Sequence, residues 1–176
     1  AGITDSATVT VGGNLIATTD ANSGVIDMGT LAVTGTITLT TEGDGAATID
    51  NGTANIDIAA ASVGGNLTLT SGAAAGITDS GTVTVGGNLK ATTDANSGVI
   101  NMVNLAVDGS IALTTDGTGD ATIVNDAGLN FGESTVGGDL TATATTLNIS
   151  DSGTLEVTGA TIITLGTNPV LSVSGA

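Results

Sequence analysis

Apolar and polar residues alternate along most of this chain. Before a recurring glycine, Val83 and Val85 alternate with polar residues, and after it Leu89 and Ala91 do the same. A third apolar position lies upstream of each such glycine: Ile3, Ile26, Ile49, Ile77, Ile100, Ile123 and Ile149. Val, Ile and Thr dominate these runs, as is typical of pleated strands. A period of two rather than 3.6 predicts three short strands around each glycine and almost no helix.

The glycine belongs to a hinge motif that joins two such runs. Its clearest copies read Val-Gly-Gly-Asn-Leu at residues 11–15, 63–67 and 85–89, and again at 136–140 with Asp139 in place of Asn. The second glycine of each hinge, weaker copies included, is Gly13, Gly35, Gly65, Gly87, Gly109, Gly138 or Gly159. A bend that recurs every ~22 residues, with two longer steps after Gly35 and Gly109, predicts an all-β solenoid. We expect one segment over residues 1–176, with about seven coils.

Stacking the hinges above one another aligns apolar residues into inward columns. One such column is Leu15, Ile37, Leu67, Leu89, Ile111 and Leu140. Coils stacked in this way pair as parallel strands about 4.8 Å apart, and each full coil serves as the crossover. Because such crossovers are usually right-handed, we expect a right-handed, three-faced parallel β-helix.

A long duplication organises the coils into larger units. Residues 1–51 align with residues 75–125, and 39 of the 51 positions are identical. The offset from residue 1 to residue 75 equals three hinge spacings, which predicts super-repeats of three coils at 1–74, 75–146 and, in part, 147–176. The two longer spacings place additional residues at 50–62 and 124–135. Their pairs Ile56/Ile58 and Leu129/Phe131 suggest a short extra strand or arm that projects from the rod, either as a tolerated insertion or as a binding arm.

The charge narrows the range of partners. There are 17 acidic residues against the single base Lys90, for a net charge of −16. Such a chain has no basic surface for nucleic acid phosphates or anionic lipid. It contains no Cys, and no apolar run of about 18 residues that would span a membrane. Since residue 1 is Ala and already lies within a repeat, we expect a piece of a longer or processed chain.

The repeats resemble those of a known family. The strings VGGNLTLTS and SGTVTVGGNLKATT, with Gly-Gly-Asn-Leu-x-x-x-Thr after SGT-[VL]-x-V, resemble the repeat region of filamentous-haemagglutinin-like exoproteins and related giant β-strand-repeat surface proteins of bacteria. The resemblance covers the whole chain. It implies a right-handed parallel β-helix, exported to the cell surface as the stalk or fibre of an adhesin.

Catalysis is not expected. The chain has no His, Arg or Tyr, so acid–base chemistry would fall to carboxylates alone. Two carboxylates can serve a glycosidase, but the aromatic rings that usually hold sugars are missing. The near-perfect duplication also argues against a unique active site. We therefore predict a protein that is not an enzyme.

Calcium is the one cofactor that the sequence suggests. Asp20 and Asn22, with their copies Asp94 and Asn96, place oxygen-bearing side chains at alternate positions of a glycine-closed turn. The same corner one coil later holds a second set of acids: Glu42, Asp44, Asp116 and Asp120. Hard cations favour such oxygens, but neither an EF-hand nor a calcium-repeat motif is complete. Asp and Asn also stabilise turns by their own hydrogen bonds, so turn chemistry and calcium both stay open.

Threonines form a further pattern. One outward column is predicted to hold Thr18, Thr40, Thr70, Thr92, Thr114 and Thr143, and the column beside it is broken by Ile16, Lys90 and Ala112. Two unbroken columns would resemble an ice-binding face, whereas one is an ordinary outer ladder of β-branched residues.

The functional prediction is a structural extracellular rod on a bacterial surface, adhesin-like in kind. The rival is a self-assembling fibre or sheath subunit, because neither end carries a recognisable cap and open strand edges accept further coils or another copy. A surface glycan or host receptor would be bound through other regions of such a protein.

Overall fold

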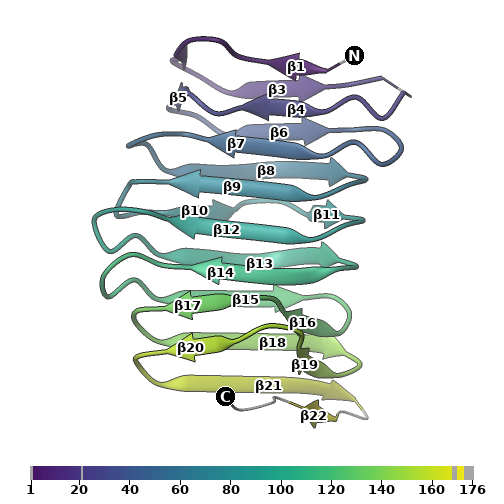
Figure 1. Cartoon of the computed structure of the whole chain (residues 1–176), viewed down its shortest axis with the longest axis vertical. Helices are drawn as coiled ribbons and strands as arrows, with labels where there is room; N and C mark the ends of the chain where they lie inside the picture. The colour runs from purple at the N-terminus through teal and green to yellow at the C-terminus, as the bar shows by residue number, and fades with distance from the viewer. Residues whose placement is uncertain (1, 21, 168–169, 173–176) are drawn as a thin grey trace.

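The computed structural model describes residues 2–20, 22–167 and 170–172, and these residues form strands and turns with no helix. The strands wind into a right-handed parallel β-solenoid of about 8 turns. In Figure 1 the chain descends from the N-terminus, running one way along the front layer and the opposite way along the back layer. The predicted fold class is confirmed. No helix among the described residues is long and apolar enough to cross a membrane.

Three sheets hold the strands of the described residues. Sheet A, the 11-stranded sheet, contains β1 (Ile3–Thr4), β4 (Ile26–Met28), β7 (Ala47–Asp50), β9 (Leu67–Ser71), β12 (Leu89–Thr93), β14 (Ser110–Thr114), β16 (Leu129–Phe131), β17 (Ser134–Val136), β19 (Ile149–Asp151), β20 (Leu155–Val157) and β22 (Leu171–Ser172). Sheet B is the pair β2 (Val9–Val11) and β5 (Leu31–Val33). Sheet C, the 9-stranded sheet, contains β3 (Leu15–Thr18), β6 (Ile37–Thr40), β8 (Ile56–Val63), β10 (Ile77–Asp79), β11 (Val83–Val85), β13 (Ile100–Val107), β15 (Ala121–Asn125), β18 (Leu140–Thr146) and β21 (Thr161–Thr167).

The core lies between sheets A and C and is filled by aliphatic side chains. The alternation read from the sequence is confirmed: Thr84 faces outward between the buried Val83 and Val85, and Lys90 faces outward between the buried Leu89 and Ala91. Phe131, the one aromatic residue, is also fully buried. Most strands contribute two or three inward side chains, and the long strands β8 and β13 contribute four. A coil therefore has too little core of its own and is stabilised by its neighbours.

The column that runs through sheet A gives the length of a coil. It contains Ile3, Ile26, Ala47, Leu67, Leu89, Ile111 and Phe131, each paired with the next. Each step along this column is close to the shorter hinge spacing, and none is as long as the step from Gly35 to Gly65. The coils are therefore nearly equal in length. This is why the chain completes about 8 turns rather than the predicted seven.

The stacking of the hinges differs from the prediction. Leu15 pairs with Ile37 as expected, but Ile37 then pairs with Ile58, and Leu67 pairs with Ala47. The predicted single column is therefore broken after Ile37 and again after Ile111, whereas Leu67, Leu89 and Ile111 pair in the predicted order. The reason is that the two longer spacings each span one and a half coils, so the hinge moves to the other edge of the rod. The super-repeat holds about three and a half coils, not three, and its copies lie half a turn apart.

The change of edge is visible strand by strand. The hinges at Gly13 and Gly35 lead from sheet B to sheet C, and those at Gly65, Gly87 and Gly109 lead from sheet C to sheet A. At Gly138 and Gly159 the hinge leads from sheet A back to sheet C.

The longer spacings do not form arms. Ile56 and Ile58 in β8, and Leu129 and Phe131 in β16, are at most 2% exposed and belong to the core. Residues 50–62 and 124–135 are thus ordinary parts of the solenoid. The three-strand coil is present where β1, β2 and β3 follow one another, whereas in β8 and β13 one strand of 8 residues replaces two short ones.

Candidate functional site

The candidate calcium turns lie on two opposite edges of the rod. Asp20 and residues 22–24 lie between β3 and β4, from sheet C to sheet A, whereas residues 94–98, of identical sequence to 20–24, connect β12 to β13, from sheet A to sheet C. As predicted, the second set of acids stacks on each turn one coil later. The Asp44 N–H donates to Ser23 Oγ, and the Thr118 N–H donates to Ser97 Oγ, both at 3.2 Å.

A buried threonine closes each of these four turns. Thr19, at 6% exposure, donates its hydroxyl to the Gly24 carbonyl at 2.8 Å. The other three hydroxyls make the same bond at 2.6–2.8 Å: Thr41 to Gly45, Thr93 to Gly98 and Thr115 to Gly119. The Thr115 oxygen also accepts from the Gly137 N–H of the next coil, at 2.9 Å. The threonine therefore both shapes its turn and ties it to the following coil.

Several of the candidate ligands already have protein partners. Asp116 Oδ2 accepts from the Ser97 N–H at 3.1 Å, and Asp120 Oδ1 accepts from the Asp139 N–H at 2.7 Å. Asn96 Nδ2 donates to the Gly72 carbonyl at 2.7 Å. Asp20, Asn22, Glu42, Asp44 and Asp94 lie at the surface. Within the described part of the chain, no three Asp, Glu, His or Cys side chains gather as a metal site would need. Calcium at these turns stays a prediction.

The asparagine of the hinge motif links neighbouring coils. Asn88 Oδ1 accepts from the Ser110 N–H of the next coil at 2.8 Å. In the other hinges the same acceptor oxygens of Asn14, Asn66 and Asp139 accept from the N–H groups of Thr36, Asn88 and Ala160 at 2.7–3.0 Å. Asn148, outside the hinge motif, accepts in the same way from the Val170 N–H at 2.9 Å. The carboxylate of Asp139 serves as well as an amide, because only an acceptor is needed.

This bond also explains the second glycine of the motif. A Cβ on Gly109 would lie 2.7 Å from the Gly87 carbonyl carbon and would collide with Asn88 Oδ1. Gly35 and Gly87 are confined in the same way by the coil beneath them. In the first hinge, by contrast, both Gly12 and Gly13 have open space where a Cβ would lie.

The Asp5 carboxylate joins its own loop to the loop of Gly29 and Thr30 in the next coil. Asp5 accepts from the Thr30 hydroxyl and N–H, both at 2.8 Å, and from the Gly29 N–H at 3.2 Å. The hydroxyl bond is the largest cause and lowers the pKa of Asp5; desolvation opposes it, and the backbone bonds from Thr30 and Gly29 add to the lowering. In the second super-repeat, Asp79 accepts from the N–H groups of Val103 and Asn104 at 2.9 and 2.8 Å.

Two buried asparagines were not identified from the sequence. Asn51 and Asn125 are each 1% exposed and form hydrogen bonds with both side-chain atoms. The signal was present, since Asn51 continues the inward series Ala47, Ile49 and Asn125 continues Ala121, Ile123. A polar residue at an inward position is the feature that points to such a site.

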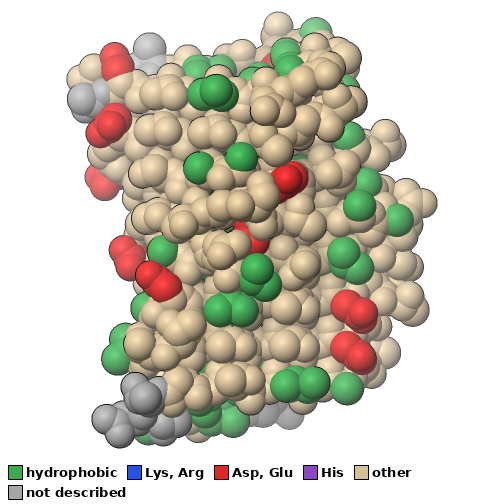
Figure 2. All heavy atoms as spheres, turned by 180° about the vertical axis from the view of Figure 1, so that it is seen from behind, with side chains coloured by type: hydrophobic (Ala, Val, Ile, Leu, Met, Phe, Trp, Pro, Cys, Tyr) green, Lys and Arg blue, Asp and Glu red, His purple; other side chains and the backbone are tan. Residues whose placement is uncertain are grey.

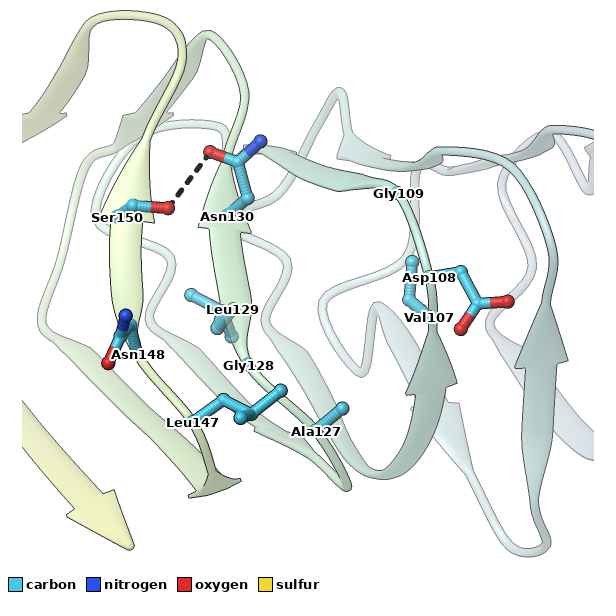
Figure 3. A pocket seen from close by; sticks show the side chains of 10 residues that line it. All are labelled: Val107, Asp108, Gly109, Ala127, Gly128, Leu129, Asn130, Leu147, Asn148 and Ser150. Carbon is cyan, nitrogen blue, oxygen red and sulfur yellow. Dashed lines mark hydrogen bonds between the residues drawn. The ribbon is translucent and has the colours of Figure 1, made fainter. Parts of the chain in front are cut away.

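Two surface hollows formed by the described residues are shallow. One of about 430 Å³ lies at the rod's edge, beside the second longer spacing, and Asp108 is the only ionisable side chain that lines it. In Figure 3 the Asp108 carboxylate points away from Leu129, while Ser150 donates to Asn130 across the opposite wall. Another of about 440 Å³, on the outer face of sheet A, contains Lys90 and Glu133. These hollows offer no pair of facing carboxylates.

One outer face of the rod carries mostly small polar side chains. Figure 2 shows scattered hydrophobic side chains and a few acids among mostly polar and backbone atoms. The predicted threonine column is interrupted. Thr18 pairs with Thr40, and Thr70, Thr92 and Thr114 pair in order, as predicted, but Thr40 pairs next with Ser62 in sheet C, and Thr114 pairs next with Thr135 in sheet A. The half-turn between super-repeats divides the predicted column.

These features define a repeat protein of the β-solenoid class. Residues 44–108 and 118–172, together more than half of the chain, match the family of repeats of unknown function (DUF5649), and the chain belongs to that family. The two matches begin at residues 44 and 118, which are separated by the same offset as residues 1 and 75 of the duplication. No curated protein and no solved structure matches the chain.

Proposed function

We propose that this chain is a structural, non-catalytic rod segment on the outside of a bacterial cell, part of an adhesin-like exoprotein of the filamentous-haemagglutinin kind. The observation that carries the proposal is the uninterrupted stacking of coils. Every coil is joined to the next by parallel strand pairs and by side-chain bonds such as those of Asn88 and Thr115. Such a repeating interface suits a protein that acts as a rigid spacer.

The surface composition supports an extracellular place. A net charge of −16 keeps a rod soluble and separate from anionic membranes. The absence of Cys from the sequence avoids wrong disulfides during export. The repeat pattern resembles that of exported surface proteins, and the solenoid fold is the one that this resemblance implies.

Intact cells that make the native protein provide the test. An antibody raised against residues 1–176 should bind unpermeabilised cells, and added protease should remove the epitope. A protected epitope that appears only after lysis would contradict the surface location. Loss of adhesion after deletion of these repeats, with the rest of the protein still exported, would support the stalk role.

A self-assembling fibre is the second candidate, and one observation favours it. The inward residues of the outermost coils, such as Ile3, Val9, Leu155 and Val157, are only partly buried. A further coil would cover them, whether it came from the same chain or from another copy. Electron microscopy of the native material separates the two candidates, because axial polymers with a fixed repeat require the second.

A further inference from the structure

The chain shifts by half a turn at each of the two longer hinge spacings, and a buried asparagine lies at the start of each shift. Asn51 follows β7 and Asn125 ends β15, and each lies within one of the two longer hinge spacings. At the corresponding third inward position, β18 carries Ala144, and five other coils carry a hydroxyl residue: Thr19, Thr41, Ser71, Thr93 and Thr115. The carboxamide is therefore the residue type that distinguishes the two steps.

The two carboxamides make the same set of bonds. Asn51 Oδ1 accepts from the Val33 N–H at 2.8 Å, and Asn51 Nδ2 donates to the Val33 carbonyl at 3.0 Å. Asn125 does the same with Val107, at 2.9 and 3.1 Å. The second Nδ2 hydrogen goes to the following turn, at Asn55 (2.7 Å) or Gly128 (2.6 Å). In both copies, Oδ1 and the two Nδ2 hydrogens of the carboxamide therefore all have a hydrogen-bond partner.

The partner of each carboxamide is the last residue of a strand. Val33 ends β5, and sheet B has no third strand to pair with it. Val107 likewise ends β13. In a parallel sheet one residue directs its N–H and its C=O to the same neighbour, so a single carboxamide replaces the missing strand. Because both groups are buried, leaving them unpaired would be unfavourable.

We propose that Asn51 and Asn125 set the phase of the rod. Each carboxamide occupies the place of a further strand beside Val33 or Val107, so the parallel pairing ends there. Its bond to the following turn then directs the chain into the opposite sheet sooner than in the other coils. The next hinge then falls on the other edge. As a consequence, alternate super-repeats show the same surface turns on opposite edges, displaced by about 17 Å for three and a half coils at about 4.8 Å each.

Cysteine pairs report the phase directly, because the chain has no Cys of its own. Thr40 pairs with Ser62 across neighbouring coils, and Thr114 pairs with Thr135. Without the half-turn, Thr40 would lie beside Thr70 and Thr114 beside Thr143. In the parent sequence, oxidation of T40C/S62C and T114C/T135C should give disulfides, whereas T40C/T70C and T114C/T143C should not.

The Asn51→Leu variant is then combined with each pair. We expect the 40–62 disulfide to be lost while the 114–135 disulfide persists, and the Val33 amide to exchange about tenfold faster. Asn101→Leu, at an exposed asparagine of β13, is the matched control and should change neither. Undiminished 40–62 cross-linking with slow Val33 exchange would overturn the proposal.

A second variant covers the case in which Asn51→Leu loses both disulfides. Asn51→Asp keeps an acceptor for the Val33 N–H but cannot donate to Val33 or Asn55 when ionised. A selective decrease of the 40–62 disulfide in this variant supports the phase-setting role. Loss of both disulfides in both variants means that Asn51 holds the whole rod rather than its phase, and the proposal fails.

Discussion

Asn88 and Gly109 act as one unit, although they lie in consecutive coils. The Asn88 side chain occupies the space beside Gly109 and accepts from the Ser110 N–H at 2.8 Å. Gly109 itself donates its N–H to the Gly87 carbonyl at 3.0 Å, so the backbone cannot move away to admit a side chain. Gly109→Ala should therefore lower the free energy of unfolding by about 1–3 kcal/mol, measured by urea denaturation. Gly12→Ala is the control, since nothing lies within 4 Å of its Cβ position. Equal effects of the two substitutions would contradict this explanation of the second glycine.

Asp5 gives a prediction that depends on pH. The Thr30 hydroxyl and the backbone N–H groups of Thr30 and Gly29 lower the pKa of Asp5 from its ordinary 3.8. A lowered pKa in the folded state means that the carboxylate contributes stability above pH 4 or so, which is lost as pH falls through the folded pKa. Thr30→Val should return the pKa toward 3.8, as followed by NMR titration of the Asp5 carboxyl. Thr10→Val, on the exposed face of β2, should leave it unchanged.

At the scale of strands and turns, the sequence predicted the local structure well and the stacking less well. Alternation fixes which side of a strand is buried, so the inward residues of β6, β11 and β14 were predicted correctly. The position of a hinge around the coil depends on how the chain turns between strands, and residues 50–62 look like an insertion when only hinges are counted. The deciding bonds, from Asn51 to Val33, join residues 18 apart in different coils. The bonds of the Asn88 type also join different coils and were missed as well. An exposed Asn in a turn has many other uses, so its presence did not reveal them.

The turn closed by Thr115 offers a test at this scale. Thr115→Val preserves the shape of the side chain but removes the bond donated to Gly119 and the one accepted from Gly137. Because the side chain is buried, we expect a loss of about 1–3 kcal/mol and faster hydrogen exchange at the Gly137 amide. Thr114→Val, one residue earlier and facing outward, should have little effect on either measurement. If both variants exchange alike at Gly137, the hydroxyl does not join the two coils.

For the whole molecule, repulsion between like charges is the main effect in the sequence that opposes folding. The 17 acidic residues face a single base, so the folded rod concentrates negative charge that the unfolded chain would spread out. Added salt screens this repulsion over about 10 Å at 0.1 M. We therefore expect the melting temperature to rise when sodium chloride is added to a low-salt buffer.

The same experiment separates screening from a specific calcium site. Sodium chloride, magnesium chloride and calcium chloride are compared at equal ionic strength, each with and without a chelator. Asp116 and Asp120 already accept backbone N–H bonds, and the acidic turns lie in two groups on opposite edges of the rod. We expect calcium to raise the melting temperature no more than magnesium does. An additional rise with calcium that the chelator reverses would instead favour bound calcium. Asp94→Asn and Asp116→Asn would then locate that calcium. The additional rise in melting temperature should disappear in these variants if calcium binds at the edge that holds residues 94–98, and should persist if it binds at the turn of residues 20–24.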